Sequence, residues 1–514
     1  ALCPGSLRGC QYGLSRWVSS GVRIRRQFLS VPLRSLSDES PVSMSLAIVW
    51  FRRDLRLADN PALHAACAAH DRVLPVYIHA PEEESDWAPG AASRWWLHHS
   101  LNALRASLRG HHAELHLRRG ASAHALTALI AATGAEAVYW NRLYEPAAIA
   151  RDTRIKQALR ERGVAVHSFN AALWREPWQV ATKTGDPYRV FTPFWRNLRT
   201  MIDGSEPLPV PQPLRGATVD GGVTLESLEL LPRIRWDTGM ADAWTPGERG
   251  AQEMLELFAD DAVNDYAEGR DIPSRHGTSR LSPHLHFGEV SPRQIQAGLH
   301  RLLSGRNGKP ADVEPFLREL GWREFAHHLM FHFPETHTAN FNPKFDGFPW
   351  AAADEALIER WQRGRTGIPL VDAGMRELWH TGWMHNRVRM VVASFLTKNL
   401  RQHWHHGARW FWDTLVDADL PANSLGWQWV AGCGADAAPY FRVFNPVSQS
   451  QKFDPKGEYL ARWLPELAGA VPALRHEPWK DPSLLLRSGY PAPMVDLGES
   501  RAAALAAYGA LKGR

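Results

Sequence analysis

Leu46-Ala-Ile-Val-Trp-Phe51 is an apolar run, followed by the helix-length stretch Pro61–Ala69 and a second apolar run, Val73–Ile78. Asp59-Asn60-Pro61 supplies an N-cap and a first-turn proline for the helix between the two runs. A buried strand, a helix and another buried strand form a βαβ unit, in which the strands are parallel. This stretch therefore predicts an α/β fold.

The same alternation continues to residue 169. Further strands are expected at Glu114–Leu117, Ala137–Trp140 and Val164–Phe169, and further helices at Ala92–Leu108, Ala123–Thr133 and Ala147–Arg162. Such a series predicts a Rossmann-like parallel sheet with helices on both faces, whose ligands lie at the carboxyl ends of the strands. No G-x-G-x-x-G motif or P-loop follows any of these runs, so dinucleotide binding in this half is unsupported.

A proline-rich stretch, with Pro207, Pro209, Pro211 and Pro213 alternating, is typical of a spacer between domains. Beyond it the periodicity is helical, with helices expected at Glu248–Phe258, Pro292–Leu303, Val313–His328, Asp354–Gln362, Val371–His380, Asn386–Leu400, Trp410–Leu415 and Tyr459–Leu464. We therefore expect a leader or mis-assigned upstream segment at 1–43, an α/β domain at 44–170, a linker at 171–245 and an all-α domain at 246–514.

Composition excludes several classes of protein. The 514 residues are 44% hydrophobic and 22% charged, and no apolar run is long enough to span a bilayer, which excludes membrane and disordered proteins. The formal net charge is +5, but the six arginines and two acids of residues 1–43 leave only +1 for the remainder. A nucleic-acid partner would therefore have to bind in a local basic groove.

The four cysteines exclude a disulfide framework, a zinc ribbon and an iron–sulfur cluster, because Cys3 and Cys10 lie in the leader and Cys67 and Cys433 are far apart. Any redox chemistry then needs an organic cofactor. The leader is rich in Arg and Ser and poor in acids, so it is interpreted either as an organelle transit peptide or as upstream sequence translated ahead of Met44. We favour the second interpretation and expect a cytoplasmic protein of bacterial type.

Tryptophan is unusually frequent, with 23 in the chain and ten between residues 322 and 429. A buried indole N–H needs a partner, so a plain core does not require this density. Most of the ten are expected to be packing residues of helices, but not all of them. Two acids, an amide and two indoles also fall within Asp417–Trp429, which we interpret as a loop broken by proline and glycine. A metal is not expected there, since no His stands at ligand spacing.

Two other segments carry polar groups in suggestive places. Thr278–Ser282 places three hydroxyls and an arginine ahead of a helix start, a pattern that fits either a helix cap or phosphate binding. Glu319 and Arg323 are four residues apart on an expected helix, with Trp322 between them. They form either a surface salt bridge or one face of a pocket.

Six motifs together resemble the photolyase/cryptochrome family, most closely the class I cyclobutane pyrimidine dimer photolyases. They are Val49-Trp-Phe-Arg-Arg-Asp-Leu-Arg56, Thr278-Ser-Arg-Leu-Ser282, Trp383-Met-His-Asn-Arg387, Asp419-Leu-Pro-Ala-Asn423, Gly426-Trp-Gln-Trp429 and Asp436-Ala-Ala-Pro-Tyr-Phe-Arg442. The resemblance runs from about Leu46 to the C-terminus, in order and with family-like spacing.

The resemblance implies a helical domain that buries FAD. It also implies that the protein repairs UV-damaged DNA, is a monomer and does not bind membranes. It assigns to the cofactor Tyr266, Thr278, Ser279, Arg280, Leu281, Ser282, Phe316, Arg323, Arg389, Asp417, Asp419 and Asn423. Arg389 would pair with Asp417, and Asn423 would face the flavin N5. Phe316 stands where relatives have a Trp.

The resemblance also implies the chemistry. A dimer buried in a duplex must be flipped out to reach a flavin, and an electron from excited, reduced FAD then opens it. Lesion contacts are assigned to Glu319, Trp322, Asn386, Met390 and Trp429, with Glu319 stabilising the radical anion. DNA contacts are assigned to Arg270, Arg387 and Gln449 together with Glu319, Trp322 and Asn386. Trp427, Trp404 and Trp350 match the electron relay that restores the reduced flavin.

Two other functions in the family remain as alternatives. A (6-4) photolyase would be expected to carry His at the positions of Asn386 and Met390. A cryptochrome photoreceptor shares the fold and FAD but usually adds a regulatory tail or lacks the dimer contacts.

A second, light-harvesting chromophore, a folate or a deazaflavin, is also implied. Folate binders read Tyr-Glu-Val-Asn-Glu where this chain reads Tyr144-Glu-Pro-Ala-Ala148, so its identity stays open.

Overall fold

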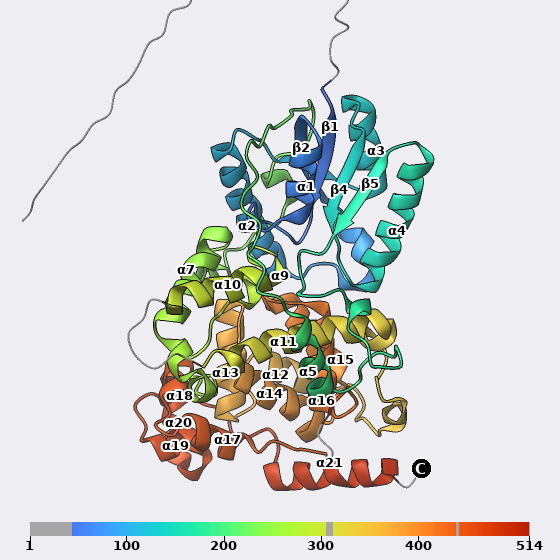
Figure 1. Cartoon of the computed structure of the whole chain (residues 1–514). Helices are drawn as coiled ribbons and strands as arrows, with labels where there is room; N and C mark the ends of the chain where they lie inside the picture. The colour runs from blue at the N-terminus through green and yellow to red at the C-terminus, as the bar shows by residue number, and fades with distance from the viewer. Residues whose placement is uncertain (1–43, 305–311, 438–440, 513–514) are drawn as a thin grey trace, which may run out of the picture. The chain divides into compact units, whose positions relative to one another are not determined.

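The computed structural model describes residues 44–304, 312–437 and 441–512, and the predicted leader lies outside these ranges. A five-stranded sheet occupies the N-terminal part, and helices make up the rest (Figure 1). The strands are β1 (Leu46–Phe51), β2 (Arg72–His79), β3 (His116–Arg119), β4 (Ala137–Asn141) and β5 (Ala165–Phe169).

The helices follow in chain order. They are α1 (Pro61–Ala69), α2 (Ala91–Gly110), α3 (Ser122–Thr133), α4 (Pro146–Glu161), α5 (Phe191–Met201), α6 (Thr238–Ala243), α7 (Glu248–Asp260), α8 (Tyr266–Gly269), α9 (Ser282–His286), α10 (Pro292–Ser304), α11 (Glu314–His332), α12 (Glu355–Gln362), α13 (Pro369–Thr381), α14 (Asn386–Ser394), the π-helical turn η7 (Phe395–Asn399), α15 (Trp404–Thr414), α16 (Leu420–Ala431), α17 (Pro446–Phe453), α18 (Glu458–Trp463), α19 (Pro472–His476), α20 (Pro482–Ser488) and α21 (Leu497–Lys512).

The sheet is parallel throughout, with the strand order β3-β2-β1-β4-β5. The chain winds outward from β1 first to one side and then to the other, so the order reverses between β1 and β4. The predicted strands and helices of this part all form, and their ends move by at most two residues. The predicted α/β fold is therefore confirmed.

Side chains of the central strand point alternately to two cores. Ala47, Val49 and Phe51 pack with α1 and α2, whereas Ile48 and Trp50 pack with α3 and α4. Strands buried on both faces read as continuous apolar runs, which is why β1 and β2 were recognisable in the sequence. Asn60 caps α1 by accepting a hydrogen bond from the Leu63 N–H at 3.1 Å.

The rest of the described chain is helical, as predicted, with some differences in the limits of its helices: α11, for example, ends at His332, four residues later than expected. Helix α15 begins at Trp404, six residues earlier than expected, because the His403 side chain accepts from the His405 N–H at 3.3 Å and caps the helix. The helix expected over Asn386–Leu400 forms as α14 and continues as the π-helical turn η7.

The segment predicted as a linker, 171–245, is not a bare spacer. The alternating prolines Pro207, Pro209, Pro211 and Pro213 lie outside regular structure, but the segment also contains α5 and α6. Phe191, Phe194 and Leu198 of α5 are buried in a core shared with α7, α10 and α11. The domain limits expected from the sequence stay a prediction.

Buried polar contacts join the α/β and helical parts. Arg56 is fully buried and donates to the backbone oxygens of Gly288 and Ala171, both at 2.8 Å. The Trp96 indole donates to Glu289 at 3.0 Å. These contacts place the carboxyl ends of the strands next to the helical part.

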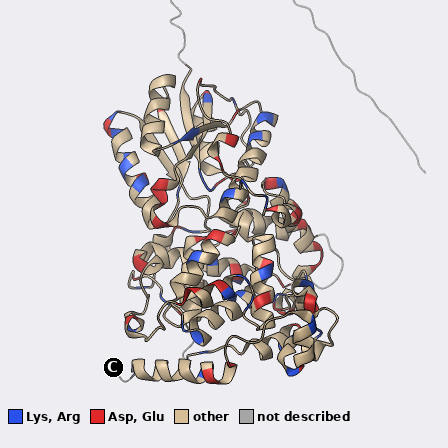
Figure 2. Cartoon of the chain, turned by 180° about the vertical axis from the view of Figure 1, so that it is seen from behind, with Lys and Arg blue, Asp and Glu red and all other residues tan. Residues whose placement is uncertain are grey.

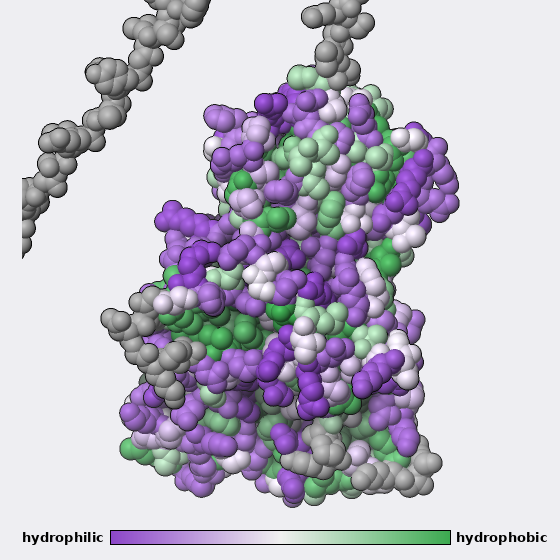
Figure 3. Space-filling model, in the orientation of Figure 1, coloured by the Kyte–Doolittle hydropathy of each residue, from purple (hydrophilic) through white to green (hydrophobic). Residues whose placement is uncertain are grey.

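The surface carries charges of both signs, interspersed over both parts (Figure 2), in keeping with the small net charge. Hydrophilic residues cover most of the face in Figure 3, and a hydrophobic area lies below α7 and α10. None of the helices in the described ranges has the length and apolarity needed to cross a membrane.

Candidate functional site

Helix α16 corrects one prediction from the sequence. Asp417–Trp429 was expected to be a loop, but residues 420–431 are helical. Asp419 caps this helix by accepting from the Ala422 N–H at 3.0 Å, and Pro421 occupies the first turn, where its missing N–H costs nothing. Asn423, Trp427 and Trp429 are therefore held on one rigid helix.

One face of α16 is packed and another is open. Ser424, Trp427 and Gln428 are buried, whereas Ala422 and Gly426, one turn apart, are exposed. A Cβ built on Gly426 would meet no atom within 4 Å. Asn423 lies next to this face and donates to the Ala408 carbonyl oxygen at 3.0 Å. The open face has room for a flat group beside an amide.

A chain of polar contacts joins three of the segments singled out in the sequence. The Ser282 hydroxyl donates to Asp417 at 2.6 Å, and Arg389 of α14 pairs with the same carboxylate at 2.9 Å. Arg389 also donates to the Met384 carbonyl oxygen at 2.7 Å. The expected pairing of Arg389 with Asp417 is thus present, and it ties Thr278–Ser282 to the start of α16.

The side chain of Arg280 is suited to bind an anionic group. Its φ of 52° is unusual for a residue other than glycine, and its Nε is buried without a hydrogen bond to any described residue. The guanidinium lies over Trp244 at 4.2 Å and Trp383 at 5.2 Å, and burial lowers its pKa. A buried cation of this kind is stabilised by an anionic group.

The remaining predicted cofactor residues lie on nearby elements. Tyr266 and Phe316 are buried in edge contact, with ring centroids 5.4 Å apart. Leu281 is buried at the start of α9, and Ser279 accepts from the Leu281 N–H at 3.4 Å. Arg323 donates to the Ala172 carbonyl oxygen at 2.7 Å and not to Glu319. Thr278 is half-buried.

The predicted DNA contacts include two neighbouring ion pairs. Arg270 pairs with Glu319 at 2.5 Å, and Arg387 pairs with Asp271 at 2.6 Å. The i,i+4 salt bridge between Glu319 and Arg323 is therefore not the one that forms. Arg387 also lies over the Phe453 ring of α17 at 4.4 Å, and Gln449, half-buried, belongs to the same helix.

The predicted lesion contacts are accessible to different extents. Asn386 is exposed at the start of α14, and Met390, one turn later, is half-buried. Trp322 of α11 is half-buried and stacks on Phe191, with centroids 3.7 Å apart. Trp429 is half-buried and donates to the Asp436 carbonyl oxygen at 3.1 Å.

The three tryptophans of the predicted relay run from the buried interior toward the surface. Trp427 is buried against Phe411, with centroids 4.9 Å apart. Trp404 is fully buried and donates to the Asn340 side chain at 3.0 Å. Trp350 is half-buried and in contact with Phe348, at 4.6 Å between centroids.

One buried cluster escaped the sequence analysis. Side-chain ligand atoms of Glu145, His327 and Asp419 lie within 4.8 Å of one another, and His286 lies 3.6 Å from Asp419. Burial alone would raise the pKa of Asp419, but His327 and His286 hold it far below its usual range. Arg53 pairs with Glu145, so we interpret the group as an ion-pair network. Its members come from separate segments, so no spacing reveals it.

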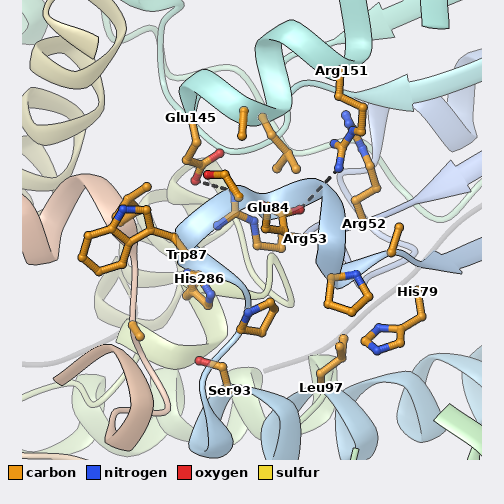
Figure 4. A pocket seen from close by; sticks show the side chains of 18 of the residues that line it. Arg52, Arg53, His79, Glu84, Trp87, Ser93, Leu97, Glu145, Arg151 and His286 are labelled. Atoms are coloured by element: carbon orange, nitrogen blue, oxygen red, sulfur yellow. Dashed lines mark hydrogen bonds and ion pairs between the residues drawn. The ribbon is translucent and has the colours of Figure 1, made fainter. Parts of the chain in front are cut away.

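A pocket lies between this cluster and the sheet. Its walls include Arg52, Arg53, Glu145, Arg151 and His286, around the carboxyl ends of β1 and β4 where the strand order reverses (Figure 4). Ligands of doubly wound sheets bind at such points. Six atoms of its lining are buried without a hydrogen-bond partner in the described chain: Trp50 Nε1, Arg52 Nε, Trp87 Nε1, Glu145 Oε2, Arg151 Nη2 and His286 Nδ1. Their number favours a polar ligand.

Comparison with known proteins agrees with the two-part organisation. Residues 47–213 match a family model described as DNA photolyase, and residues 316–510 match one described as the FAD binding domain of DNA photolyase. A deoxyribodipyrimidine photo-lyase of Agrobacterium fabrum is 47% identical over 477 residues, which are 90% of this chain and 98% of the relative. Cryptochrome-1 of Arabidopsis thaliana is 40% identical, over 89% of this chain and 69% of the relative.

A solved structure is similar over nearly the whole chain. The crystal structure of a bacterial class III photolyase from Agrobacterium tumefaciens matches with a TM-score of 0.87 and 46% identity, covering 93% of this chain and all of that one. That structure is described as class III, whereas the sequence motifs most resemble class I, so the class of this chain stays a prediction. The chain belongs to the photolyase/cryptochrome family.

Proposed function

We propose that this protein is a deoxyribodipyrimidine photo-lyase, an enzyme that uses light to repair cyclobutane pyrimidine dimers in DNA by electron transfer. The observation that carries the proposal is the helical scaffold on which an open face of α16 lies beside Asn423, while α11 and α14 present Glu319 and Asn386 to solvent. The first feature accepts a flat cofactor and the second accepts a base.

FAD is the cofactor of the family, and the residues present fit it. Arg280 offers a buried donor that lacks a partner, as a diphosphate requires, and His385 offers another through its Nε2. The exposed Ala422 and Gly426 leave room for a ring system on α16, and Asn423 offers an amide at its edge. Ser282, Arg389 and Asp417 form a polar border to the same site.

Bound in its reduced form, FAD supplies the light-excited electron that opens the cyclobutane ring and takes it back afterwards. The protein contributes the placement of the lesion. Trp322 and Trp429 provide apolar walls for a flipped-out dimer, and Met390 packs against it. Asn386 and Glu319 hydrogen-bond the base edges, where charge develops when the dimer is reduced.

Arg270, Arg387 and Gln449 contact the DNA backbone. The two arginines are held by Glu319 and Asp271 in the free protein, so each can exchange a carboxylate for a phosphate. Because the net charge is small, these local contacts and not a global field draw the DNA.

Trp427, Trp404 and Trp350 form the relay that restores the reduced cofactor under light. The order follows burial, from Trp427 and Trp404 in the interior to Trp350 near the surface. An indole can lose one electron and receive another without bond breakage, so the relay needs only close rings.

The pocket at the end of β1 and β4 takes the light-harvesting chromophore. Its unpaired donors and acceptor, on arginines, a carboxylate and indole and imidazole rings, suit a polar heteroaromatic molecule. A folate and a deazaflavin both have this chemistry, and the residues do not discriminate between them.

A cryptochrome-type photoreceptor is the second candidate, favoured by the similarity to a plant cryptochrome. The presence of Glu319, Trp322, Asn386, Met390 and Trp429 supports repair over sensing. The (6-4) photolyase alternative is disfavoured by Asn386 and Met390.

The experiment is a repair assay with purified, flavin-loaded protein that has been chemically reduced. Blue light should restore pyrimidines in an oligonucleotide containing a cyclobutane dimer, and not in one containing a (6-4) product. Trp427→Phe should block photoreduction yet leave repair by prereduced protein unchanged. Intact dimers after illumination of the reduced protein would overturn the proposed function in favour of the photoreceptor.

A further inference from the structure

The ring of His403 lies between two tryptophans of the proposed relay. Its centroid is 5.0 Å from that of Trp350, with the planes at 65°, and 5.7 Å from that of Trp404, with the planes at 29°. Trp404 is fully buried and Trp350 is half-buried. His403 therefore spans the step from the interior to the surface-facing indole.

A hydrogen bond fixes the orientation of His403. It is the N-cap of α15, and its Nδ1 accepts from the His405 N–H at 3.3 Å. A nitrogen that accepts a hydrogen bond carries no proton, so the neutral ring bears its proton on Nε2. Protonation of Nδ1 would remove the cap. Helix capping thus holds the ring in place in its uncharged form.

The surroundings also favour the uncharged ring. Burial lowers the pKa of His403, and His406 on the same helix adds to the effect. The adjoining His405 is faced by Arg409 of α15 and by His337 from the segment Pro334–His337. The groups acting on this histidine cluster are cationic or basic, and none of them stabilises an imidazolium.

We propose that His403 is a positioning residue of the electron relay: its uncharged ring holds Trp350 and Trp404 in one aromatic cluster, by an edge contact to Trp350 and a stacked contact to Trp404, along which the electron hole moves to the surface. The inference rests on the proposed function, because it takes these tryptophans as relay members. His403 lies outside the six family motifs.

The electron balance is simple. A flavin bound as proposed would, when oxidised and photoexcited, serve as the one-electron oxidant of Trp427. Trp404 then gives an electron to Trp427, and Trp350 gives one to Trp404. No bond forms or breaks in these transfers. The electron hole ends on Trp350, which is then reduced by a thiol in solution.

Charge on the ring matters as much as contact. A positive charge 5.0 to 5.7 Å from two indoles disfavours their oxidised, cationic forms. Trp427 contacts Phe411 and Trp361 and is not among the rings in contact with His403, so it is affected less. With a charged His403, the electron hole would therefore stay on Trp427. From there it would recombine with the electron on the flavin.

Two substitutions distinguish the effect of the aromatic ring from the effect of the helix cap. His403→Asn keeps a good N-cap but loses the ring, and His403→Phe keeps a ring but loses the cap. His405→Phe is the matched control, because His405 contacts Trp404 at 3.9 Å from the same helix and is not the cap. The yield of the long-lived surface tryptophan radical is measured by flash absorption on flavin-loaded protein, with the thermal midpoint recorded in parallel.

We expect His403→Asn to lower the radical yield about tenfold at an unchanged thermal midpoint, whereas His403→Phe and His405→Phe keep the wild-type yield. The wild-type yield should fall only as the pH drops below about 6.5, because the pKa of His403 is lowered from that value, and the yield of His403→Phe should stay flat, since only the wild type acquires the charge. Repair by prereduced protein should be equal in all variants.

A wild-type yield in His403→Asn, or a loss shared equally by Asn and Phe, would overturn the inference. If His403→Asn does not bind flavin, the comparison of pH profiles between wild type and His403→Phe decides, and parallel profiles would overturn it. A failure of the proposed relay looks different, because Trp404→Phe would then also keep the wild-type yield.

Discussion

Glu319 is the residue on which the proposed repair chemistry depends most. Its carboxylate pairs with Arg270 at 2.5 Å, and both side chains are partly exposed, so a base can displace the arginine. Glu319→Ala removes the polar group placed where charge develops, and should lower the repair yield about tenfold at an unchanged FAD content. Glu314→Ala, on the same helix and paired with Arg199, should keep the yield. Equal yields in the two variants would contradict the assigned role.

Glu377 provides a residue-scale test of stability. It is buried on α13 and accepts hydrogen bonds from the Tyr459 hydroxyl at 2.7 Å and the His385 N–H at 3.3 Å. Burial raises the pKa of Glu377 from 4.5 to about 7. Below pH 4.5 the group is protonated in both states. Between pH 4.5 and 7 the folded state binds more protons than the unfolded state, so stability is lost as the pH rises.

The glutamine of Glu377→Gln does not titrate. The free energy of unfolding of this variant, relative to that of the wild type, should therefore increase from pH 4.5 to 7, by up to about 3 kcal/mol. The measurement is the thermal midpoint across this range at equal flavin content. Glu359→Gln, exposed on α12 and paired with Arg363, should follow the wild type. A constant difference for Glu377→Gln across the range would show that the carboxyl is ionised throughout.

At the scale of elements, two glycines on the packed helices α15 and α16 have opposite roles: Gly407 lies in their contact, and Gly426 lies on the open face of α16. A Cβ on Gly407 would lie 2.0 Å from the Trp427 ring, whereas one on Gly426 would meet nothing within 4 Å. Gly407→Ala should destabilise the protein by about 1–3 kcal/mol and disturb Trp427. Gly426→Ala should stabilise the apoprotein by about 1 kcal/mol but lower its FAD content, because the methyl group fills the open face.

Thermal midpoints of the flavin-free proteins and absorbance of the flavin-loaded ones measure both effects. The two variants are controls for each other, since they change the same atoms on facing helices. Normal FAD binding by Gly426→Ala would place the cofactor away from this face of α16.

Helix α16 also marks how far the sequence could be read. Pro421 and Gly426 act as helix breakers in most settings, but a proline in the first turn and a tightly packed helix permit both. The strands could be predicted because apolar runs buried on both faces are continuous. Site residues in or next to the motifs, such as Asn423 and Arg389, could be assigned by resemblance. The cluster of Glu145, His327 and Asp419 could not, because it exists only through tertiary packing.

At the scale of the whole molecule, the buried cluster lies between the two proposed ligand sites. Glu145 and His286 line the pocket at the sheet, while Asp419 caps α16, whose open face is assigned to the flavin. The two sites are thus close without sharing a wall residue of the flavin face. This arrangement suits energy transfer from a light-harvesting chromophore, and it allows one site to be altered without the other.

Filling the pocket tests this arrangement. Ala147 lies in the pocket wall near the start of α4, and Ala147→Phe should exclude the second chromophore and leave FAD in place. The absorbance of the second chromophore should disappear, and repair in weak light at its absorption maximum should fall severalfold, while repair under direct flavin excitation stays constant. Ala150→Phe, exposed on the same helix, should change neither. A repair action spectrum identical for wild type and Ala147→Phe would mean that this pocket does not collect light for the flavin.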